Sequence, residues 1–406
     1  MMIQNGSLGR RVVWGLVGML MGGSMVWAGE GEVGPGVPAF TVREGYRVTL
    51  AADKLDEARF MEFDDKGNLY LAQPGKGRIL QLKDKDGDGV YETRTVFLEG
   101  KKSIHGMYFN AKDGWMYFTV PNAGAAGRAR DDDGDGKAEK VEMIVPDGTL
   151  PGGPTGHPFY GPMVTEDGKT LLVTVSDSRN MTAELDSPNK TIYAFDIDGK
   201  NKRVFATGVR NTEKIRYRPG TSEIYGFDHG SDNFGQKYGD EIGKDQPITD
   251  LNPPEKLNLI KEGAFYGHPY LVANKVPRPE FADREDIHQL ADKMTNPVWT
   301  LGAHFATCGW TFLSKDYFPG HRGDIFVACH GSWDSVVRKV GYRVERVMFD
   351  PMTGKPYGSW MIVGTLAKDG KTVLARPVDC VEAPDGSVLF SSDSTRQIYR
   401  ISKIDK

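Results

Sequence analysis

Cysteine is scarce in this sequence. Its 406 residues include only Cys308, Cys329 and Cys380. Their spacing matches neither a zinc-binding pattern nor a haem attachment motif, so those two signatures are absent. An odd number leaves at least one thiol without an internal partner. Because each cysteine lies in an apolar segment, a buried small hydrophobic side chain is the favoured interpretation, and a disulfide is the alternative.

The chain also lacks a strong charge of either sign. Lys and Arg number 51 against 55 Asp and Glu, which leaves a formal net charge of -4. A nucleic-acid-binding domain normally carries a basic surface, so this composition argues against nucleic acid as a partner.

Long apolar runs are missing, apart from one near the N-terminus. Residues 12–27 are rich in Leu, Met, Val and Gly, follow Arg10 and Arg11, and end just before Ala28. The run is shorter than the ~20 residues of a membrane span. A positive flank, a short apolar stretch and a small residue are typical of a secretory signal peptide. We expect residues 1–28 to be removed after Ala28, which predicts a periplasmic or secreted protein without a transmembrane segment. An uncleaved anchor is the alternative.

Glycine and turn motifs are abundant, and one sequence motif recurs six times. It combines an Asp-Gly or Pro-Gly turn with a following strand of large apolar residues. The six copies are DDKGNLYLA from Asp64, AKDGWMYFT from Ala111, TEDGKTLLVTV from Thr165, RPGTSEIYGF from Arg218, FPGHRGDIFVA from Phe318 and APDGSVLFSS from Ala383. Another short apolar run precedes each copy, and a turn between two such runs is typical of a β-hairpin.

Repetition about every 50 residues predicts units that bury their apolar faces only against their neighbours. The expected fold is all-β: a six-bladed β-propeller of four-stranded antiparallel blades, formed by residues 40–406 after a flexible lead at 29–39. The strand at 45–52 is expected to join the last blade and close the ring. The longest gap, between Pro219 and Pro319, predicts an insertion at about 228–300 over the channel mouth.

Two acidic loops, DKDGDGVYE from Asp84 and DDDGDGKAE from Asp131, occupy equivalent places in the first two repeats. Alternating aspartates around glycine resemble calcium-binding loops, although no flanking helices indicate an EF-hand. An acidic surface hairpin is the alternative. The expected oxygen ligands are Asp84, Asp86, Asp88, Asp131, Asp133, Asp135 and, at the twelfth position of the second loop, Glu142.

Several polar residues lie between the repeats, where the packing of apolar strands does not require them. His157 precedes one strand and Asp177 follows the next, so both could reach the same end of a blade. A carboxylate beside an imidazole raises its basicity, as a general base requires. Cationic side chains in later repeats could converge on the same mouth and bind an anion. These are Arg210 (next to Asn211), His304, His330, Arg338, Lys339 and Arg376. A structural role is the alternative for each one.

The order of these motifs resembles the glucose/sorbosone dehydrogenase family, six-bladed propellers that oxidise sugars with pyrroloquinoline quinone (PQQ) and calcium. The resemblance covers about residues 40–404 and rests on ATGVRN, EGAFYGHPY, FVACHGSW, GYRVERVMFD and ARPVDCVEAPDG.

The resemblance implies a role for particular residues. It implies His157 as the catalytic base with Asp177 as its support, and Arg210 with Asn211 at the quinone. It implies main-chain carbonyls of Gly230 and Ser231 as calcium ligands, and an arginine of the last blade, Arg376, at a cofactor carboxylate. The segment GSWD at 331–334 departs from the family pattern, and Arg338 or Lys339 is expected to substitute there.

The resemblance therefore implies an exported quinoprotein that oxidises an aldose or a sorbosone-like sugar. Without a haem motif, its electrons would leave to a separate acceptor, either a cytochrome or the quinone pool. Two alternatives remain open. One is a calcium-dependent lactonase or esterase with Asn211, Asp232 and Glu255 as conceivable ligands. The other is a propeller that binds ligands without catalysis.

Overall fold

The computed structural model describes residues 30–153, 157, 160–183, 187–232, 247–332 and 338–404. The expected signal peptide and its cleavage point lie outside these residues. No helix in the described part of the chain is both long enough and apolar enough to span a bilayer.

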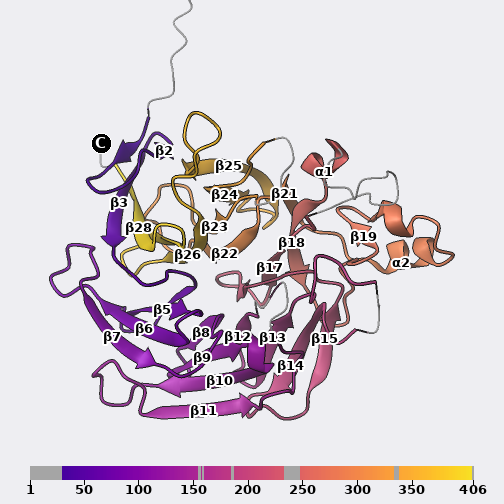
Figure 1. Ribbon diagram of the computed structural model, residues 1–406, viewed down its shortest axis with the longest axis horizontal. Helices are drawn as coiled ribbons and strands as arrows, with labels where there is room; N and C mark the ends of the chain where they lie inside the picture. Colours follow the sequence, from indigo (N-terminus) through magenta and orange to yellow (C-terminus); the bar gives the residue numbers. More distant parts are fainter. Residues whose placement is uncertain are drawn as a thin grey trace, which may run out of the picture.

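Six antiparallel sheets stand around a common axis in chain order (Figure 1). Blade 1 contains β4 (Met61–Phe63), β5 (Leu69–Gln73), β6 (Arg78–Lys83) and β7 (Thr93–Leu98). Blade 2 contains β8 (Met107–Asn110), β9 (Trp115–Val120), β10 (Ala125–Arg130) and β11 (Lys140–Val145), with the short helix η1 (Pro121–Ala123). Blade 3 contains β12 (Pro162–Val164), β13 (Thr170–Val175), β14 (Thr191–Asp196) and β15 (Arg203–Thr207).

The other three blades continue the same order. Blade 4 contains β16 (Ile215–Tyr217), β17 (Ile224–Asp228), β18 (Pro254–Ile260) and β21 (Trp299–Ala303). Blade 5 contains β22 (Thr307–Phe312), β23 (Ile325–Cys329), β24 (Arg343–Phe349) and β25 (Pro356–Gly364), and blade 6 contains β26 (Pro377–Glu382), β27 (Val388–Ser392) and β28 (Gln397–Lys403). The six-bladed propeller expected from the repeats is confirmed.

All six repeated turns fall between the first and second strands of their blades. The strand after each turn is covered by neighbouring blades on both faces, and in β5 and β27 all five residues are buried. A strand covered on both faces is largely apolar, which explains the strong sequence signal. The turn glycine is needed at Gly386, for example, where φ is 93°.

The N-terminal segment closes the ring, as the sequence predicted. Strand β3 (Tyr46–Ala52) pairs antiparallel with β28 and completes blade 6. Strand β2 (Thr41–Val42) pairs with β25 and adds a fifth strand to blade 5. Strand β1 (Glu32–Val33), within the expected flexible lead, pairs parallel with β3.

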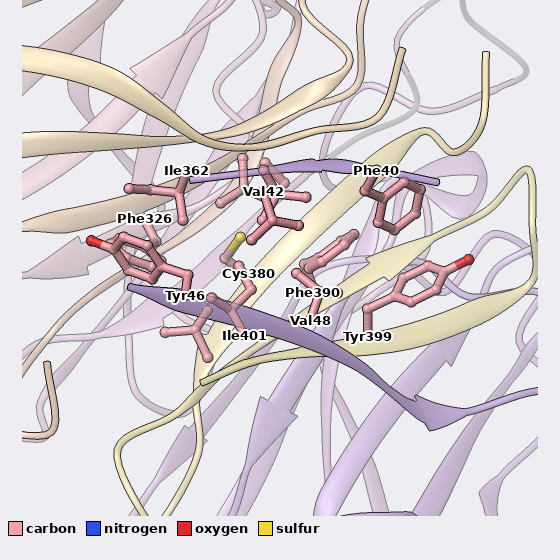
Figure 2. Close-up of a cluster of buried hydrophobic side chains, with 14 of the residues drawn as sticks. Phe40, Val42, Tyr46, Val48, Phe326, Ile362, Cys380, Phe390, Tyr399 and Ile401 are labelled. Carbon is pink, nitrogen blue, oxygen red and sulfur yellow. The ribbon is translucent and has the colours of Figure 1, made fainter. Parts of the chain in front are cut away.

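Figure 2 shows the core between the last two blades. Phe40, Val42 and Val48 of the N-terminal segment pack against Phe390 and other side chains of blades 5 and 6. Each fully buried side chain of this size contributes roughly 1.5–3 kcal/mol. The two ends of the propeller are therefore joined by apolar packing as well as by strand pairing. Cys380 lies in this core, and all three cysteines are buried and free.

The long gap between Pro219 and Pro319 contains the two outer strands of blade 4 and two excursions. One excursion precedes β18 and includes α1 (Pro247–Leu251). The other, residues 261–298, contains β19 (Leu271–Val272), β20 (Val276–Pro277), η3 (Pro279–Phe281) and α2 (Ile287–Lys293). The second excursion has a small core of its own around Tyr270, Leu290 and Met294, and it projects at the side of blade 4 (Figure 1).

Buried ion pairs tie different blades together near the axis. Lys214, just before β16, donates from Nζ to Asp379 Oδ1 of β26 at 2.8 Å, and Asp379 Oδ2 accepts from the Met61 main chain of β4 at 2.8 Å. A Cβ at Gly309 would lie 1.9 Å from Asp379 Oδ1, so only glycine leaves room for this contact. The half-buried Arg216 similarly pairs with Glu62 of β4.

Candidate active site

The axial ends of the blades enclose a cavity of about 270 Å³. Its walls come from loops that precede the first strand or follow the second strand of several blades. Antiparallel strands bring these two kinds of loop to the same end of each blade. The lining residues are Arg59, His157, Arg210, Asn211, Glu213, His229, Gly230, Asp232, Glu255, His304, Ala306, Cys308, His330, Gly331, Ser332 and Arg376. The structure thus gathers seven of the residues named from the sequence for the dehydrogenase: His157, Arg210, Asn211, Gly230, His304, His330 and Arg376.

Arg210 makes the most extensive contacts in this cavity. Its guanidinium donates to Asn180 O at 2.8 Å, to Asn180 Oδ1 at 2.8 Å and to Gly230 O at 2.7 Å. The Arg210 main-chain N–H donates to the buried Asp228 carboxylate at 2.8 Å. The side chain is 3% exposed, so these contacts hold one cationic group in a fixed orientation inside the cavity.

His157 faces Arg210 through one ring nitrogen. The Arg210 Nη2 group lies 3.2 Å from His157 Nε2. A guanidinium can only donate hydrogen bonds, so Nε2 is the unprotonated nitrogen of the ring and Nδ1 carries the proton. Burial, followed by the charges of Arg210 and His229, lowers the pKa of His157 to about 3. The imidazole is therefore neutral at physiological pH, as a proton acceptor must be.

The Asp177 carboxylate does not contact the His157 ring in the way the sequence suggested. Its Oδ2 lies 2.7 Å from Nε2 of His268, and it also accepts from the Thr182 main chain at 3.0 Å. His268 comes from the excursion after β18, whose fold brings its ring to the buried carboxylate. Asp177 still partly offsets the low pKa of His157, first through a hydrogen bond of its main chain and then through its negative charge.

A chain of contacts leads from Asn211 toward the axis. The Asn211 Oδ1 atom accepts from Ser176 Oγ at 2.6 Å, and Nδ2 lies 3.1 Å from Glu213 Oε1 and 3.2 Å from His229 Nδ1. Burial raises the pKa of Glu213 to about 7, although Arg59 opposes this shift. Asn211 therefore orients two ionisable side chains in the cavity wall.

The opposite wall carries two further cations of blades 1 and 6. His330 Nε2 lies 3.1 Å from the Asp393 carboxylate, which also accepts from Arg59 Nη1 at 2.7 Å. Arg376 donates to the main-chain carbonyls of His330 at 3.2 Å and Gly331 at 3.1 Å. Both arginines are fixed while their side chains line the cavity.

Several predicted residues lie elsewhere. Arg338 and Lys339 are exposed and do not line the cavity, so neither fills the place expected for them. Trp333 to Ser335 of the departing segment lie outside the described residues. Ser231 lines a small neighbouring space beneath the Gly230 loop, where its hydroxyl accepts from Arg278. The Gly230 carbonyl is bound to the Arg210 guanidinium at 2.7 Å. A calcium ion at this loop would have to share the Gly230 carbonyl oxygen with the Arg210 cation.

The three ligands conceivable for a lactonase, Asn211, Asp232 and Glu255, do line the same cavity. However, burial raises the pKa of Glu255 to about 8, and main-chain N–H groups of Gly230 and Ala306 already occupy its oxygens. A carboxyl group protonated at neutral pH is a poor ligand for calcium.

The two acidic loops lie away from the cavity, between the third and fourth strands of blades 1 and 2. Carboxylate oxygens of Asp84, Asp86 and Asp88 lie within 4.8 Å of one another. In the second loop the equivalent group is Asp131, Asp133, Asp135 and Glu139. Glu142 is not in that group. It stands opposite Arg128 in the β10–β11 pairing and accepts from its guanidinium at 2.8 Å.

Sequence reasoning missed Arg59, Glu213, Cys308 and His268 as members or supports of this site. Three of them lie at or just before the first strand of a blade, where the chain approaches the axis. A search for polar residues at that repeated position would have found Arg59 and Glu213. Nothing in the sequence indicates which carboxylate His268 meets.

Comparisons with known proteins identify the family of this chain and two similar proteins. The model of the TrAA12-like family matches residues 40–404. The chain belongs to the TrAA12-like family. An uncharacterized protein of Borreliella burgdorferi is 28% identical over 242 residues, which cover 59% of this chain and 58% of that relative. A second, from Synechocystis, is 23% identical over 276 residues, or 61% of this chain and 57% of the relative. The chain thus spans less than two thirds of the length of these curated relatives.

Solved structures similar to this TrAA12-like protein share its fold. A family AA12 enzyme of Trichoderma reesei, in an iodide structure, has a TM-score of 0.77 at 18% identity, covering 91% of this chain and 98% of that one. The PQQ domain of pyranose dehydrogenase from Coprinopsis cinerea, in its holo form, has a TM-score of 0.76 at 19% identity, covering 91% and 100%. The PQQ-bound aldose sugar dehydrogenase of Streptomyces coelicolor has a TM-score of 0.58 at 15% identity, covering 89% and 99%. The resemblance stated from the sequence is confirmed.

Proposed function

We propose that this protein is a PQQ-dependent dehydrogenase that oxidises a sugar at a hydroxyl or aldehyde carbon. One observation carries the proposal: a neutral, fixed imidazole, His157, shares an axial cavity with three buried or half-buried arginines. Two solved relatives with the same fold are named for PQQ. Fold alone does not determine activity, so the argument rests on the cavity.

The donor set of the cavity suits a flat ring that carries several carboxylates. Arg59, Arg210 and Arg376 approach from blades 1, 4 and 6, and guanidinium groups are the strongest partners for carboxylates. His304 and His330 of the wall add polar ring groups that need not carry charge. When bound, PQQ would supply the acceptor for the hydride removed from the sugar.

The remaining chemistry belongs to the chain itself. His157 would take the proton of the sugar hydroxyl at Nε2, because this nitrogen carries the lone pair. Arg210 would yield that contact when substrate enters, while its bonds to Asn180 and Gly230 keep the guanidinium in place. The Asp177–His268 pair would hold the loop beside His157 without taking part in proton transfer.

The proposal includes no calcium ion at Gly230 and Ser231, because the Arg210 guanidinium already donates to the Gly230 carbonyl oxygen. Export through residues 1–28 and electron transfer to a separate acceptor remain parts of it. The sugar would reach the base through the same open cavity.

The test is an absorbance titration of the purified protein with PQQ, with and without calcium, followed by dye reduction across a panel of aldoses, ketoses and lactones. We expect saturable PQQ binding and dye reduction with at least one sugar. Hydrolysis of a lactone by protein without PQQ would contradict the dehydrogenase and favour the lactonase. Binding of sugar without dye reduction would favour the non-catalytic propeller.

A further inference from the structure

The floor of the axial cavity holds a group of side chains that the proposed oxidation does not use. Glu213, His229 and Cys308 come from two neighbouring blades, and one potential ligand atom of each lies within 4.8 Å of the others. All three residues are buried. The group combines a carboxylate oxygen, an imidazole nitrogen and a thiol sulfur.

The three side chains converge on one point. His229 presents Nε2 toward this point, 3.7 Å from Glu213 Oε1. Two ligands at ~2.1 Å from a tetrahedral ion are themselves about 3.4 Å apart, so this separation is close to the one an ion requires. A Cys–His–Glu relay would place the thiol and the carboxylate at different ring nitrogens. Here the carboxylate lies on the Nε2 side of the ring, and one ligand atom of each residue lies within 4.8 Å of the others, so the three side chains can share one ion.

Polar atoms in this group lack well-placed partners in the described part of the chain. Glu213 Oε2 and His229 Nε2 are fully buried and neither has a hydrogen-bond partner of good geometry among the described residues; Glu213 interacts with the Cys308 thiol and His229 with the Thr307 main chain. A buried polar atom without a partner costs roughly 1–3 kcal/mol, so such atoms usually have a ligand or a function. The other ring nitrogen, His229 Nδ1, lies 3.2 Å from Asn211 Nδ2, and this amide supports a metal-bound ring once its oxygen, in place of its nitrogen, faces Nδ1. Histidines that bind a metal almost always have this kind of outer support.

We infer that Glu213, His229 and Cys308 form a binding site for a zinc-like divalent transition metal, with a fourth position open to the cavity. The nitrogen, oxygen and sulfur donors match the preference of Zn²⁺ and Co²⁺, not that of Ca²⁺. Three protein ligands with one open position are typical of zinc sites that act on a substrate.

The charges balance when the metal enters. The thiolate and the carboxylate together neutralise a divalent ion, and their protons pass to solvent. The nearby Arg59 is already paired with Asp393 at 2.7 Å, so its charge is compensated. When the metal takes His229 Nε2, Nδ1 carries the ring proton and the Asn211 amide presents its oxygen to it. Ser176 then accepts from the Asn211 amide nitrogen instead of donating to its oxygen, and Glu213 Oε1 leaves its 3.1 Å contact with that nitrogen and turns to the metal.

The test uses Co²⁺ as the probe, added to the purified protein in excess calcium so that the acidic loops are filled. We expect one Co²⁺ per chain and a thiolate-to-cobalt charge-transfer band in the near ultraviolet, which Zn²⁺ abolishes by competition. The acidic loops offer only oxygen ligands and cannot give this band.

Cys308→Ala should remove the band, and the matched control Cys329→Ala, a buried cysteine outside the cavity, should keep it. His229→Gln provides a second variant and should weaken Co²⁺ binding by more than about tenfold. Thermal unfolding of each variant confirms that it is folded. An unmodified protein that shows no band, or a Cys308→Ala variant that keeps it, would overturn the inference. The result is independent of PQQ, so it stands or falls separately from the dehydrogenase activity.

Discussion

The two groups of buried polar residues near the axis of this propeller differ in how completely they are paired. In the tie between blades, Lys214 meets Asp379 at 2.8 Å and Asp379 also accepts from the Met61 main chain. In the cavity, Glu213 Oε2 and His229 Nε2 have no hydrogen-bond partner of good geometry among the described residues. Both groups are buried to a similar degree. The comparison teaches that satisfied polar groups hold the blades together here, whereas unsatisfied ones mark the place for a ligand.

The largest effect is expected at the satisfied tie. Lys214→Met leaves the Asp379 carboxylate buried without its cation, which should lower the free energy of unfolding by about 3–5 kcal/mol. Chemical denaturation measures this change. The double variant Lys214→Met with Asp379→Leu should recover much of the loss, because it removes both charges. A single variant as stable as the parent would mean that the tie is not structural.

In the cavity the expected effect falls on catalysis instead. His157→Ala should lower turnover by ~100-fold, as expected for a positioned general base, while PQQ still binds and thermal stability is preserved. Steady-state dye reduction and PQQ titration measure the two quantities. His321→Gln is the matched control, since that histidine lies outside the cavity and should leave turnover at neutral pH unchanged. Equal turnover in the His157→Ala variant would remove the catalytic assignment.

Acid should weaken the fold through histidines that are held neutral beside arginines. Burial and then Arg346 lower the pKa of His321 to about 4, below the usual 6.5 of the unfolded chain. Between these values the unfolded state binds the proton and the native state does not, so stability is present above pH 6.5 and is lost as pH falls toward 4. We expect a loss under about 1 kcal/mol per pH unit from this half-buried ring.

Denaturant titrations of the parent and of His321→Gln at several pH values measure this loss. The variant should show a shallower fall of stability with acid. Parallel curves would show that His321 is not among the responsible groups.

The smallest effect is expected at the acidic loops. If Asp131 and its neighbours bind calcium, added calcium raises the melting temperature by mass action. Asp131→Asn should reduce this rise, while Asp147→Asn, an exposed aspartate outside both loops, should not. Thermal unfolding with calcium and with chelator measures the difference. A calcium response that is identical in both variants would leave the second loop as an acidic hairpin.

The blades were predictable because each repeat carries its own turn chemistry. The Asp-Gly and Pro-Gly phrases fix a hairpin locally, and the strand after them is apolar enough to identify without tertiary information. The closing strand was also predictable, since GYRVTLAA has no partner nearby. These features depend on short segments of sequence, and the same turn-and-strand motif occurs six times, which strengthens the prediction.

The pairing of the site residues was less predictable. Asp177 was expected at His157, but His268 competes for it from an excursion far along the chain. Glu142 satisfied a spacing rule for calcium, yet the hairpin register turns it toward Arg128 and leaves Glu139 in the loop. Sequence spacing identifies residues of the right chemical type. Which of them meet depends on register and on distant segments.

Ring closure by β3 also constrains how the molecule is made. During synthesis β3 leaves the ribosome early, while β28, its hydrogen-bonding neighbour, is among the final described segments. Blades 1 to 4 can form as they emerge, but the apolar side of β3 around Val48 stays uncovered until then. Until β28 has been synthesised, the nascent protein therefore carries an uncovered strand edge at β3 that can pair with another chain.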